Sequence, residues 1–216
     1  MEMQLKDKAE IIEKYFDEIL PNAGCELTYN SDYGFLISVM LSAQCTDKKV
    51  NKVTEKMFSK YKTLKELNDA PLLDIENMIM PLGLYKNKAK NLKGITKLLI
   101  ENYNEKVPED KKELMKFPGV GNKASNVVRC ELFKIPEFPV DTHVFRVSKR
   151  LGLVRDDASI EEVEKELKEI FSEKNWIKLH HQFIHFGRYY CKAIKPACST
   201  CKLYGFCKNL AKTNYF

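Results

Sequence analysis

The sequence predicts an all-α protein. Apolar residues recur at spacings of three and four over most of the 216 residues, which is the period of a helix with one buried face. No segment of useful length alternates apolar and polar residues in the manner of a half-buried strand. Residues that favour helix starts stand directly before several of the apolar runs. Helices joined by short turns therefore account for the pattern.

The amino-terminal half contains six predicted helices. The first carries apolar residues from Ile11 to Ile19 and stops before Pro21. The next four open on residues that favour helix starts, namely Asp32, Thr46, Thr63 and Pro71. A longer helix follows Gly83 and places four apolar residues on one face: Ala89, Leu92, Ile95 and Leu99.

The carboxyl-terminal half contains five predicted helices. The first begins at Asp110 and runs into a turn at Phe117, and the second extends from Gly121 to about Phe133. The third is capped by Asp141 and ends at Leu151. The fourth begins at the capping box of Ser159 and Glu162, and the fifth runs from Trp176 to Tyr190. Between the second and third lies the segment 135–139, which carries two prolines. We expect the chain to cross there from one domain to another.

Composition excludes several classes of protein. Hydrophobic residues make up 44% of the chain and charged residues 31%, as in a folded globular protein rather than a disordered one. The first residues contain no apolar run, so no secretory signal is predicted, and the apolar stretch 35–41 is too short to cross a bilayer. We therefore expect a cytoplasmic protein, associated with the nucleoid if the source is prokaryotic. The net charge of +6 permits nucleic-acid binding without indicating it.

Four of the seven cysteines crowd into 17 residues, spaced C-x6-C-x2-C-x5-C: Cys191, Cys198, Cys201 and Cys207. Disulfides explain such a group poorly in a reducing compartment, whereas metal ligation explains it well. The spacing alone fits a zinc site and an iron–sulfur cluster about equally.

A tight hairpin is predicted between two helices at Gly119, Val120 and Gly121. Glycine adopts positive φ without cost, so the chain can reverse sharply there. The reversal would leave backbone N–H groups at the start of the next helix able to hold a phosphate oxygen. An ordinary corner between two helices is the alternative interpretation.

Lys123 follows this hairpin, and Asp141 lies eighteen residues further on. A lysine amine is a nucleophile only when deprotonated, which requires its pKa to fall from about 10.4 toward neutrality. A carboxylate nearby could accept the proton and stabilise positive charge on a substrate. The alternatives are a solvated surface lysine and an aspartate that only caps a helix.

Five segments resemble the endonuclease III family. Residues 114–124 resemble its helix-hairpin-helix, residues 140–146 its catalytic-aspartate segment, and residues 187–190 its approach to the cysteine loop. Residues 41–47 and 83–85 resemble two further signatures of the family. The resemblance covers nearly the whole chain. One departure is Asn122, where the family commonly has a basic residue.

The resemblance implies a reaction. The Lys123 amine would attack C1′ of a damaged nucleotide in duplex DNA, expel an oxidised pyrimidine and form a Schiff base. Asp141 would accept the lysine proton, and β-elimination would cut the strand 3′ to the abasic site. Gln44 and Leu84 would fill the gap left by the flipped nucleotide, with Asp47 near the lesion pocket.

The resemblance also implies a [4Fe–4S] cluster held by the four cysteines of the carboxyl-terminal segment. Lys192 and Lys195, on the loop after the first cysteine, could contact DNA phosphates, although two solvated lysines explain the pattern nearly as well. In the family the cluster is not the site of base excision, so we expect its role to be structural and electrostatic.

The resulting prediction is two helical domains with a DNA-binding cleft between them. A six-helix barrel would comprise residues 25–135 with the hairpin, and residues 1–24 with 136–216 would form the cluster domain. We expect a monomer that binds damaged or abasic duplex DNA and no membrane. Two alternatives are a monofunctional mismatch or adenine-type glycosylase, against which Lys123 argues, and a non-catalytic DNA-binding module.

Overall fold

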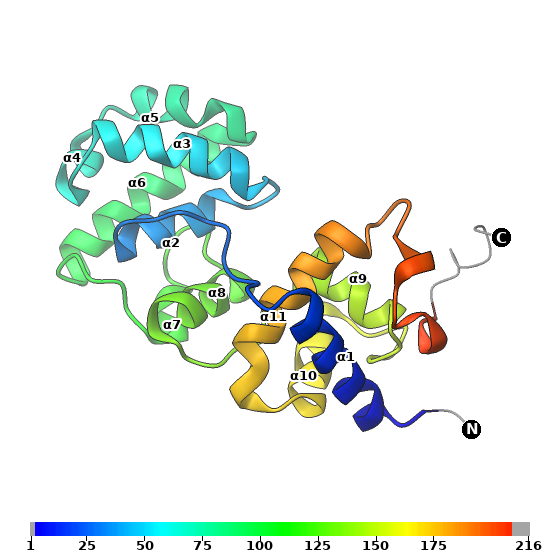
Figure 1. The fold of residues 1–216 in the computed structure, drawn as a ribbon. Helices are drawn as coiled ribbons and strands as arrows, with labels where there is room; N and C mark the ends of the chain where they lie inside the picture. The colour runs from blue at the N-terminus through cyan, green and yellow to red at the C-terminus, as the bar shows by residue number, and fades with distance from the viewer. Residues whose placement is uncertain (1–2, 209–216) are drawn as a thin grey trace. The chain divides into compact units, whose positions relative to one another are not determined.

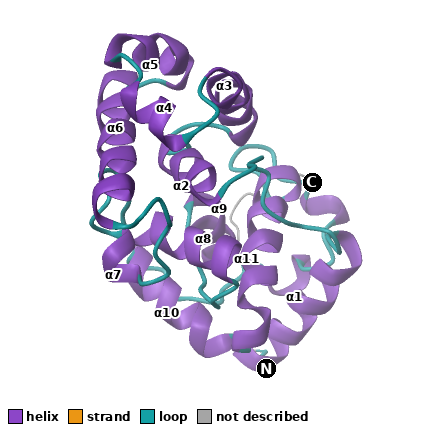
Figure 2. Ribbon diagram, turned by 90° about the vertical axis from the view of Figure 1, so that its left-hand side faces the viewer, coloured by secondary structure: helices purple, strands orange, loops and turns teal. Residues whose placement is uncertain are grey.

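The computed structural model of the chain describes residues 3–208. Those residues form helices, turns and loops without any strand (Figure 2), which confirms the all-α prediction. The described chain divides into two compact units, of which one is Glu26–Ile135 and the other joins the amino-terminal segment to the residues from Pro136 onward. None of the described helices is both long and apolar enough to span a membrane.

The unit Glu26–Ile135 contains seven α-helices and one 3-10 helix among its described residues (Figure 1). They are α2 (Asp32–Leu41), α3 (Asp47–Lys60), α4 (Leu64–Asp69), α5 (Leu72–Ile79), η1 (Met80–Leu82), α6 (Tyr85–Asn102), α7 (Lys111–Leu114) and α8 (Asn122–Phe133).

Helix α2 forms the centre of this unit. Every residue from Gly34 to Leu41 is buried, and α2 packs against α3, α6 and α8. Helix α6, the longest of the chain's described helices, packs against α4 and α5 as well as α2. Burial of α2 on all sides fixes both of its ends. It thereby places the loop that leads into α3 and supports the hairpin that precedes α8.

The second unit contains α1 from the amino-terminal segment and all elements after residue 136. They are α1 (Leu5–Ile19), α9 (Thr142–Arg150), α10 (Ile160–Ile170), η2 (Glu173–Asn175), α11 (Trp176–His185), η3 (Phe186–Tyr190), η4 (Cys198–Thr200) and η5 (Tyr204–Phe206).

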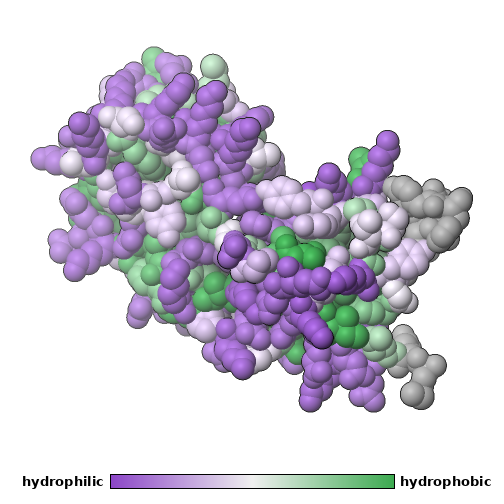
Figure 3. Space-filling model, viewed as in Figure 1, coloured by the Kyte–Doolittle hydropathy of each residue, from purple (hydrophilic) through white to green (hydrophobic). Residues whose placement is uncertain are grey.

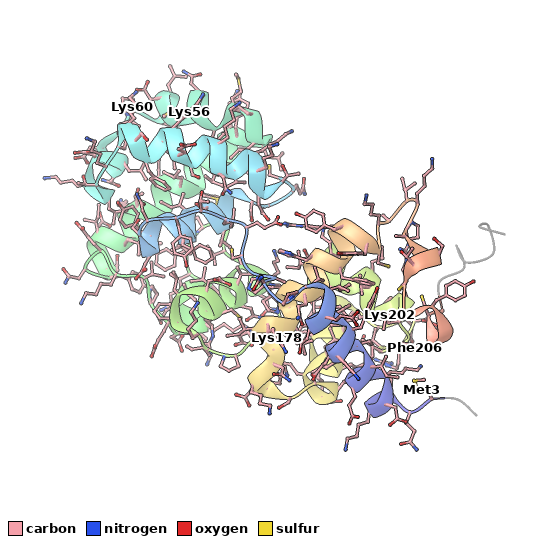
Figure 4. All side chains as sticks on the ribbon, in the orientation of Figure 1. Met3, Lys56, Lys60, Lys178, Lys202 and Phe206 are labelled. Atoms are coloured by element: carbon pink, nitrogen blue, oxygen red, sulfur yellow. The ribbon has the colours of Figure 1, made fainter. Side chains whose placement is uncertain are left out.

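An aromatic core joins α1 to the later helices of this unit. Phe16 of α1 meets Phe183 of α11 edge-to-face with ring centroids 5.1 Å apart, and Phe138 and Phe171 pack on the same ring of Phe183. Two ion pairs at the surface also tie α1 in place (Figure 4). Lys178 of α11 pairs with Asp17, and Lys202 pairs with Glu18.

Most helix starts agree with the predicted ones, because capping is local chemistry. Asp110 and Asp141 accept hydrogen bonds from the first-turn amides of α7 and α9, and Ser159 forms the predicted capping box with Glu162. The cap of α2 is an exception. The Ser31 hydroxyl accepts from the Gly34 N–H, and Asp32 already lies in the first turn.

Two predicted helices are wrong in extent. The helix that begins after Asp110 ends at Leu114 after a single turn, because the chain there tightens into the hairpin. The helix predicted from Trp176 to Tyr190 is α-helical only to His185, and a π-helical turn follows over Phe186–Tyr190. In that turn the Cys191 N–H donates to the Phe186 carbonyl, five residues back, at 2.7 Å.

Hydrophilic side chains cover most of the face shown in Figure 3. Most apolar residues lie beneath them, and the largest fully buried side chains are phenylalanines and aliphatic residues. Several large apolar side chains are nevertheless exposed, among them Leu84 with 62% of its surface.

Candidate active site and thiol centre

The hairpin before α8 is built by Gly119. Its φ is +78°, and a Cβ there would lie 2.5 Å from the Asn91 amide nitrogen and 3.0 Å from Met40, so only glycine fits. Pro118 packs against Gly94 of α6 on the other side of the turn. The turn is therefore held from beneath by α2 and α6, which fixes the direction in which α8 starts.

The backbone amides of the hairpin differ in what they can offer to a ligand. Val120 is buried, and its N–H donates to the Phe117 carbonyl at 3.0 Å. In the described part of the chain, the N–H groups of Gly119 and Gly121 make no hydrogen bond. Gly121 is the N-cap of α8 and supplies no side-chain cap. Two amides and a helix start are thus available to an anion.

Lys123 is the second residue of α8, and its side chain is exposed. The helix begins one residue earlier, at Asn122, directly after the open amides of the hairpin. The exposed Lys123 side chain therefore leaves α8 within one turn of the open hairpin amides.

Asp141 is half-buried at the N-cap of α9. Its Oδ1 accepts hydrogen bonds from the His143 and Val144 amides, both at 2.8 Å. Its Oδ2 accepts none from the described residues. One oxygen therefore orients the carboxylate while the other stays available to accept a proton.

His143 follows in the first turn of α9. Burial lowers the pKa of its imidazole, and the nearby Arg146 and Arg188 lower it further against the opposing charge of Asp141. Arg146 Nη2 lies 3.2 Å from His143 Nδ1, which suits a neutral ring whose Nδ1 accepts a hydrogen bond from the guanidinium N–H. The ring therefore adds no second positive charge beside Arg146.

The two residues predicted to enter DNA, Gln44 and Leu84, share an unusual backbone conformation. Gln44 has a φ of +56° and Leu84 a φ of +48°, and both side chains are exposed. Left-handed backbone is uncommon for residues other than glycine and marks positions where the surroundings hold the chain. Asp47, predicted from the sequence to lie near the lesion pocket, is half-buried in the first turn of α3.

The four cysteines of the carboxyl-terminal segment border one pocket with about 450 Å³ of empty volume, part of it open to solvent. Aromatic residues form much of the remaining wall, among them Tyr15, Phe186 and Tyr190. Among the described residues, no three metal-ligating side chains converge closely enough to hold a single ion. The four thiols therefore border a pocket and do not converge on a single metal position.

At Cys201, the local electrostatics disfavour a free thiolate. Burial raises the pKa of the Cys201 thiol, and the neighbouring Cys191, Cys207 and Cys198 thiols raise it further, against a lowering hydrogen bond from the Leu203 amide. A bound cation would reverse this, because it stabilises the deprotonated thiols. Arg150 Nη1 donates to the Cys191 sulfur at 3.4 Å and adds a positive neighbour.

Two arginines of α9 hold the loop after Cys191. Arg146 Nη2 donates to the Gly187 and Cys191 carbonyls at 2.9 and 3.2 Å. Arg150 donates to the Lys192 carbonyl at 2.7 Å and to the Ala193 carbonyl at 3.1 Å. Lys192 and Lys195 are exposed on this loop. The backbone that presents them is therefore fixed by the helix that Asp141 caps.

Comparison with known proteins assigns the chain to a family. Residues 37–173 match the family described as HhH-GPD superfamily base excision DNA repair protein. Endonuclease III of Bacillus subtilis is 46% identical over 88% of this chain and 87% of its own length. Endonuclease III of Rickettsia felis is 45% identical over 93% of this chain and 95% of its own. The chain belongs to the endonuclease III family.

Solved structures agree with membership of the endonuclease III family. A trapped endonuclease III–DNA covalent intermediate with an estranged adenine superposes with a TM-score of 0.93 and 45% identity, covering 98% of this chain and 100% of that one. A non-covalent endonuclease III–DNA complex gives a TM-score of 0.94 at the same identity. A thermostable thymine-DNA glycosylase, with 23% identity and a TM-score of 0.83, shares the fold.

Sequence reasoning missed three residues of this endonuclease III-family chain that organise its candidate sites. Arg146 and Arg150 hold the cysteine loop, and their spacing of four residues on one helix face was the available signal. Lys88 is buried on α6 and binds two loop carbonyls. No pattern in the sequence separates it from the chain's many surface lysines.

Proposed function

We propose that this protein excises oxidised pyrimidines from duplex DNA and then cuts the strand through a Schiff base on Lys123. Its class follows from its family, since endonuclease III enzymes are base-excision repair glycosylases that also cleave abasic sites. The observation that carries the residue assignment is the exposed amine of Lys123, in the first turn of α8 directly after the open amides of Gly119 and Gly121.

The proposed chemistry uses Lys123 and Asp141 in sequence. The neutral Lys123 amine attacks C1′ of the deoxyribose, and the bond from C1′ to the damaged base breaks. Asp141 takes up the proton that the amine loses, for which its Oδ2 is available. Ring opening gives a Schiff base between Lys123 and C1′. Loss of a C2′ proton then expels the 3′ phosphate by β-elimination.

The proposed DNA contacts use both backbone and side chains. The Gly119 and Gly121 amides would hold one phosphate, a contact that fixes register without reading sequence. Gln44 and Leu84 would fill the gap left when the damaged nucleotide leaves the stack, with Asp47 beside that nucleotide. The exposed Lys192 and Lys195 would contact further phosphates.

Cys191, Cys198, Cys201 and Cys207 are proposed to hold a [4Fe–4S] cluster. They fit the group because all four thiols border one pocket, and an arginine N–H reaches one of the sulfurs. When bound, the cluster would cross-link the segment 191–207 and fix the loop of Lys192 and Lys195. In the proposed excision step, Lys123 and Asp141 carry the bond formation and the proton transfer.

Borohydride trapping on thymine-glycol duplex DNA tests this proposal. The wild type should give a covalent adduct that Lys123→Ala abolishes, because reduction fixes a Schiff base only where an amine has formed one. Lys116→Ala is the matched control, since it removes an exposed lysine of the same segment that pairs with Glu113, and its adduct should persist.

Two other outcomes would contradict the proposal in different ways. Base release without any adduct would show a monofunctional glycosylase. Binding of the duplex with neither adduct nor base release, on this substrate and on an abasic one, would show a non-catalytic DNA-binding module.

A further inference from the structure

Lys88 of α6 is a buried lysine. Its side chain is 5% exposed, and each of its three ammonium hydrogens has an acceptor. The acceptors are the Ala43 carbonyl at 2.9 Å, the Leu82 carbonyl at 3.1 Å and the Cys45 sulfur at 3.2 Å. In the part of the chain that the structure describes, no carboxylate pairs with it. Two backbone carbonyls and one side-chain sulfur therefore compensate the buried charge.

The two carbonyls belong to the loops that carry Gln44 and Leu84. Ala43 directly precedes Gln44, and Leu82 lies two residues before Leu84. The Cys45 thiol adds a second link between the two loops, because it donates to the same Leu82 carbonyl at 2.6 Å. One ammonium and one thiol thus connect two loops that are about forty residues apart in sequence.

Both loops need such support. Gln44 and Leu84 hold positive φ angles, a backbone conformation that residues with a Cβ seldom adopt and that costs free energy. Both side chains nevertheless face solvent, with Leu84 62% exposed. Packing of the side chains therefore does not hold the two residues in place. The hydrogen bonds of Lys88 and Cys45 to the adjacent backbone can do so.

We propose that Lys88 is a positioning residue that holds Gln44 and Leu84 in the geometry needed to enter DNA. This inference rests on the proposed function, in which these two side chains fill the gap beside a flipped nucleotide. A gap-filling residue works only if its backbone is fixed before DNA arrives, because ordering it on binding would consume part of the binding free energy. Lys88 supplies this preorganisation without contacting DNA.

Lys93 provides a matched control on the same helix. Its ammonium also binds three backbone carbonyls, those of Leu67, Asn68 and Ala70, where α4 ends. It is half-buried, and burial lowers its pKa. Lys93→Met and Lys88→Met remove the same charge and leave backbone acceptors unpaired, but only Lys88→Met affects the loops of Gln44 and Leu84.

The test is fluorescence of 2-aminopurine placed opposite a tetrahydrofuran abasic analogue in duplex DNA, with saturating protein. Unstacking of the opposite base raises this fluorescence. Wild type and Lys93→Met should give the same rise, whereas Lys88→Met and Leu84→Ala should lose most of it. Single-turnover cleavage of an abasic duplex should fall about tenfold in Lys88→Met, equivalent to about 1.4 kcal/mol. It should stay within about twofold of wild type in Lys93→Met.

The double variant Leu84→Ala/Lys88→Met separates positioning from general damage. If Lys88 acts through the inserted residues, its loss should add little once Leu84 is truncated. Cys45→Ala covers the case in which Lys88→Met fails to fold. That variant removes one of the two links to the Leu82 carbonyl, and an intermediate loss of fluorescence is expected.

A full fluorescence rise in folded Lys88→Met, or in Cys45→Ala, would overturn the inference. So would equal losses in Lys88→Met and Lys93→Met. If the wild type forms no borohydride adduct on abasic duplex, the proposed function fails instead. The two failures are therefore distinguishable in one set of proteins.

Discussion

Asp141 shows how one side chain can serve the fold and the reaction together. Its Oδ1 binds two amides at the start of α9, while its Oδ2 remains without a partner among the described residues. The capping bonds fix the carboxylate in one orientation. The second oxygen therefore points in a direction set by the helix rather than by its own rotamer preference. Because one oxygen caps the helix and the other is available for the reaction, different substitutions of Asp141 should affect the stability of the protein and its activity separately.

Asp141→Asn and Asp141→Ala should differ in stability but agree in activity. Asparagine caps a helix about as well as aspartate, whereas alanine loses the cap at a cost of about 1 kcal/mol. Neither residue can accept the lysine proton. Urea unfolding should therefore place Asp141→Asn near wild type and Asp141→Ala below it, while both lose base release from thymine-glycol duplex. Full base release by Asp141→Asn would remove Asp141 from the proposed reaction.

At the scale of elements, the start of α8 is built to leave donors open. Gly121 occupies the N-cap with φ −98° and ψ −170°, an extended backbone that most residues can adopt. Nothing lies within 4 Å of the position of its Cβ. Conformation does not require glycine here, unlike at Gly119, whose φ is +78°. Gly121 supplies no side-chain cap, so a phosphate oxygen would not compete with a capping side chain at this helix start.

Gly121→Ser should therefore stabilise the protein or leave it unchanged while weakening DNA binding. A serine hydroxyl at the N-cap accepts a hydrogen bond from the amide two or three residues later, and thus competes with a phosphate oxygen. Thermal unfolding and duplex affinity by fluorescence anisotropy would measure the two effects. Gly119→Ala should instead lower the melting temperature, since its Cβ would collide with Asn91. Unchanged affinity in Gly121→Ser would argue against a phosphate at this helix start.

Across the whole molecule, local chemistry was predictable and long-range placement was not. The caps at Asp141 and Ser159 follow from side chains that bond amides two or three residues away, so the sequence contains all the partners. The π-turn before Cys191 carries no such local signal. Lys88 illustrates the general limit. The packing of α2 and η1 on α6 brings its partners, Ala43 and Leu82, close to it. The periodicity of the sequence does not indicate which groups a long side chain will contact.

The net charge of +6 gives one more whole-molecule expectation, because DNA affinity depends on where positive charge lies. Lys192 and Lys195 are exposed on a loop that Arg150 holds through the Lys192 carbonyl at 2.7 Å. If each contacts a phosphate, Lys192→Ala/Lys195→Ala should lower the slope of log affinity against log salt by about 1.8, since each contact contributes about 0.9.

A control double variant removes two lysine charges at other positions of the chain. Lys60 and Lys178 pair with Asp74 and Asp17 at 2.9 and 2.8 Å (Figure 4), so they already have acidic partners. Lys60→Ala/Lys178→Ala also lowers the net charge from +6 to +4, yet it should leave the slope nearly unchanged. Equal slopes for the two double variants would mean that the long-range field of the protein, and not contact by the cysteine loop, governs the salt dependence. A selective drop for the loop variant would place that loop on the DNA backbone.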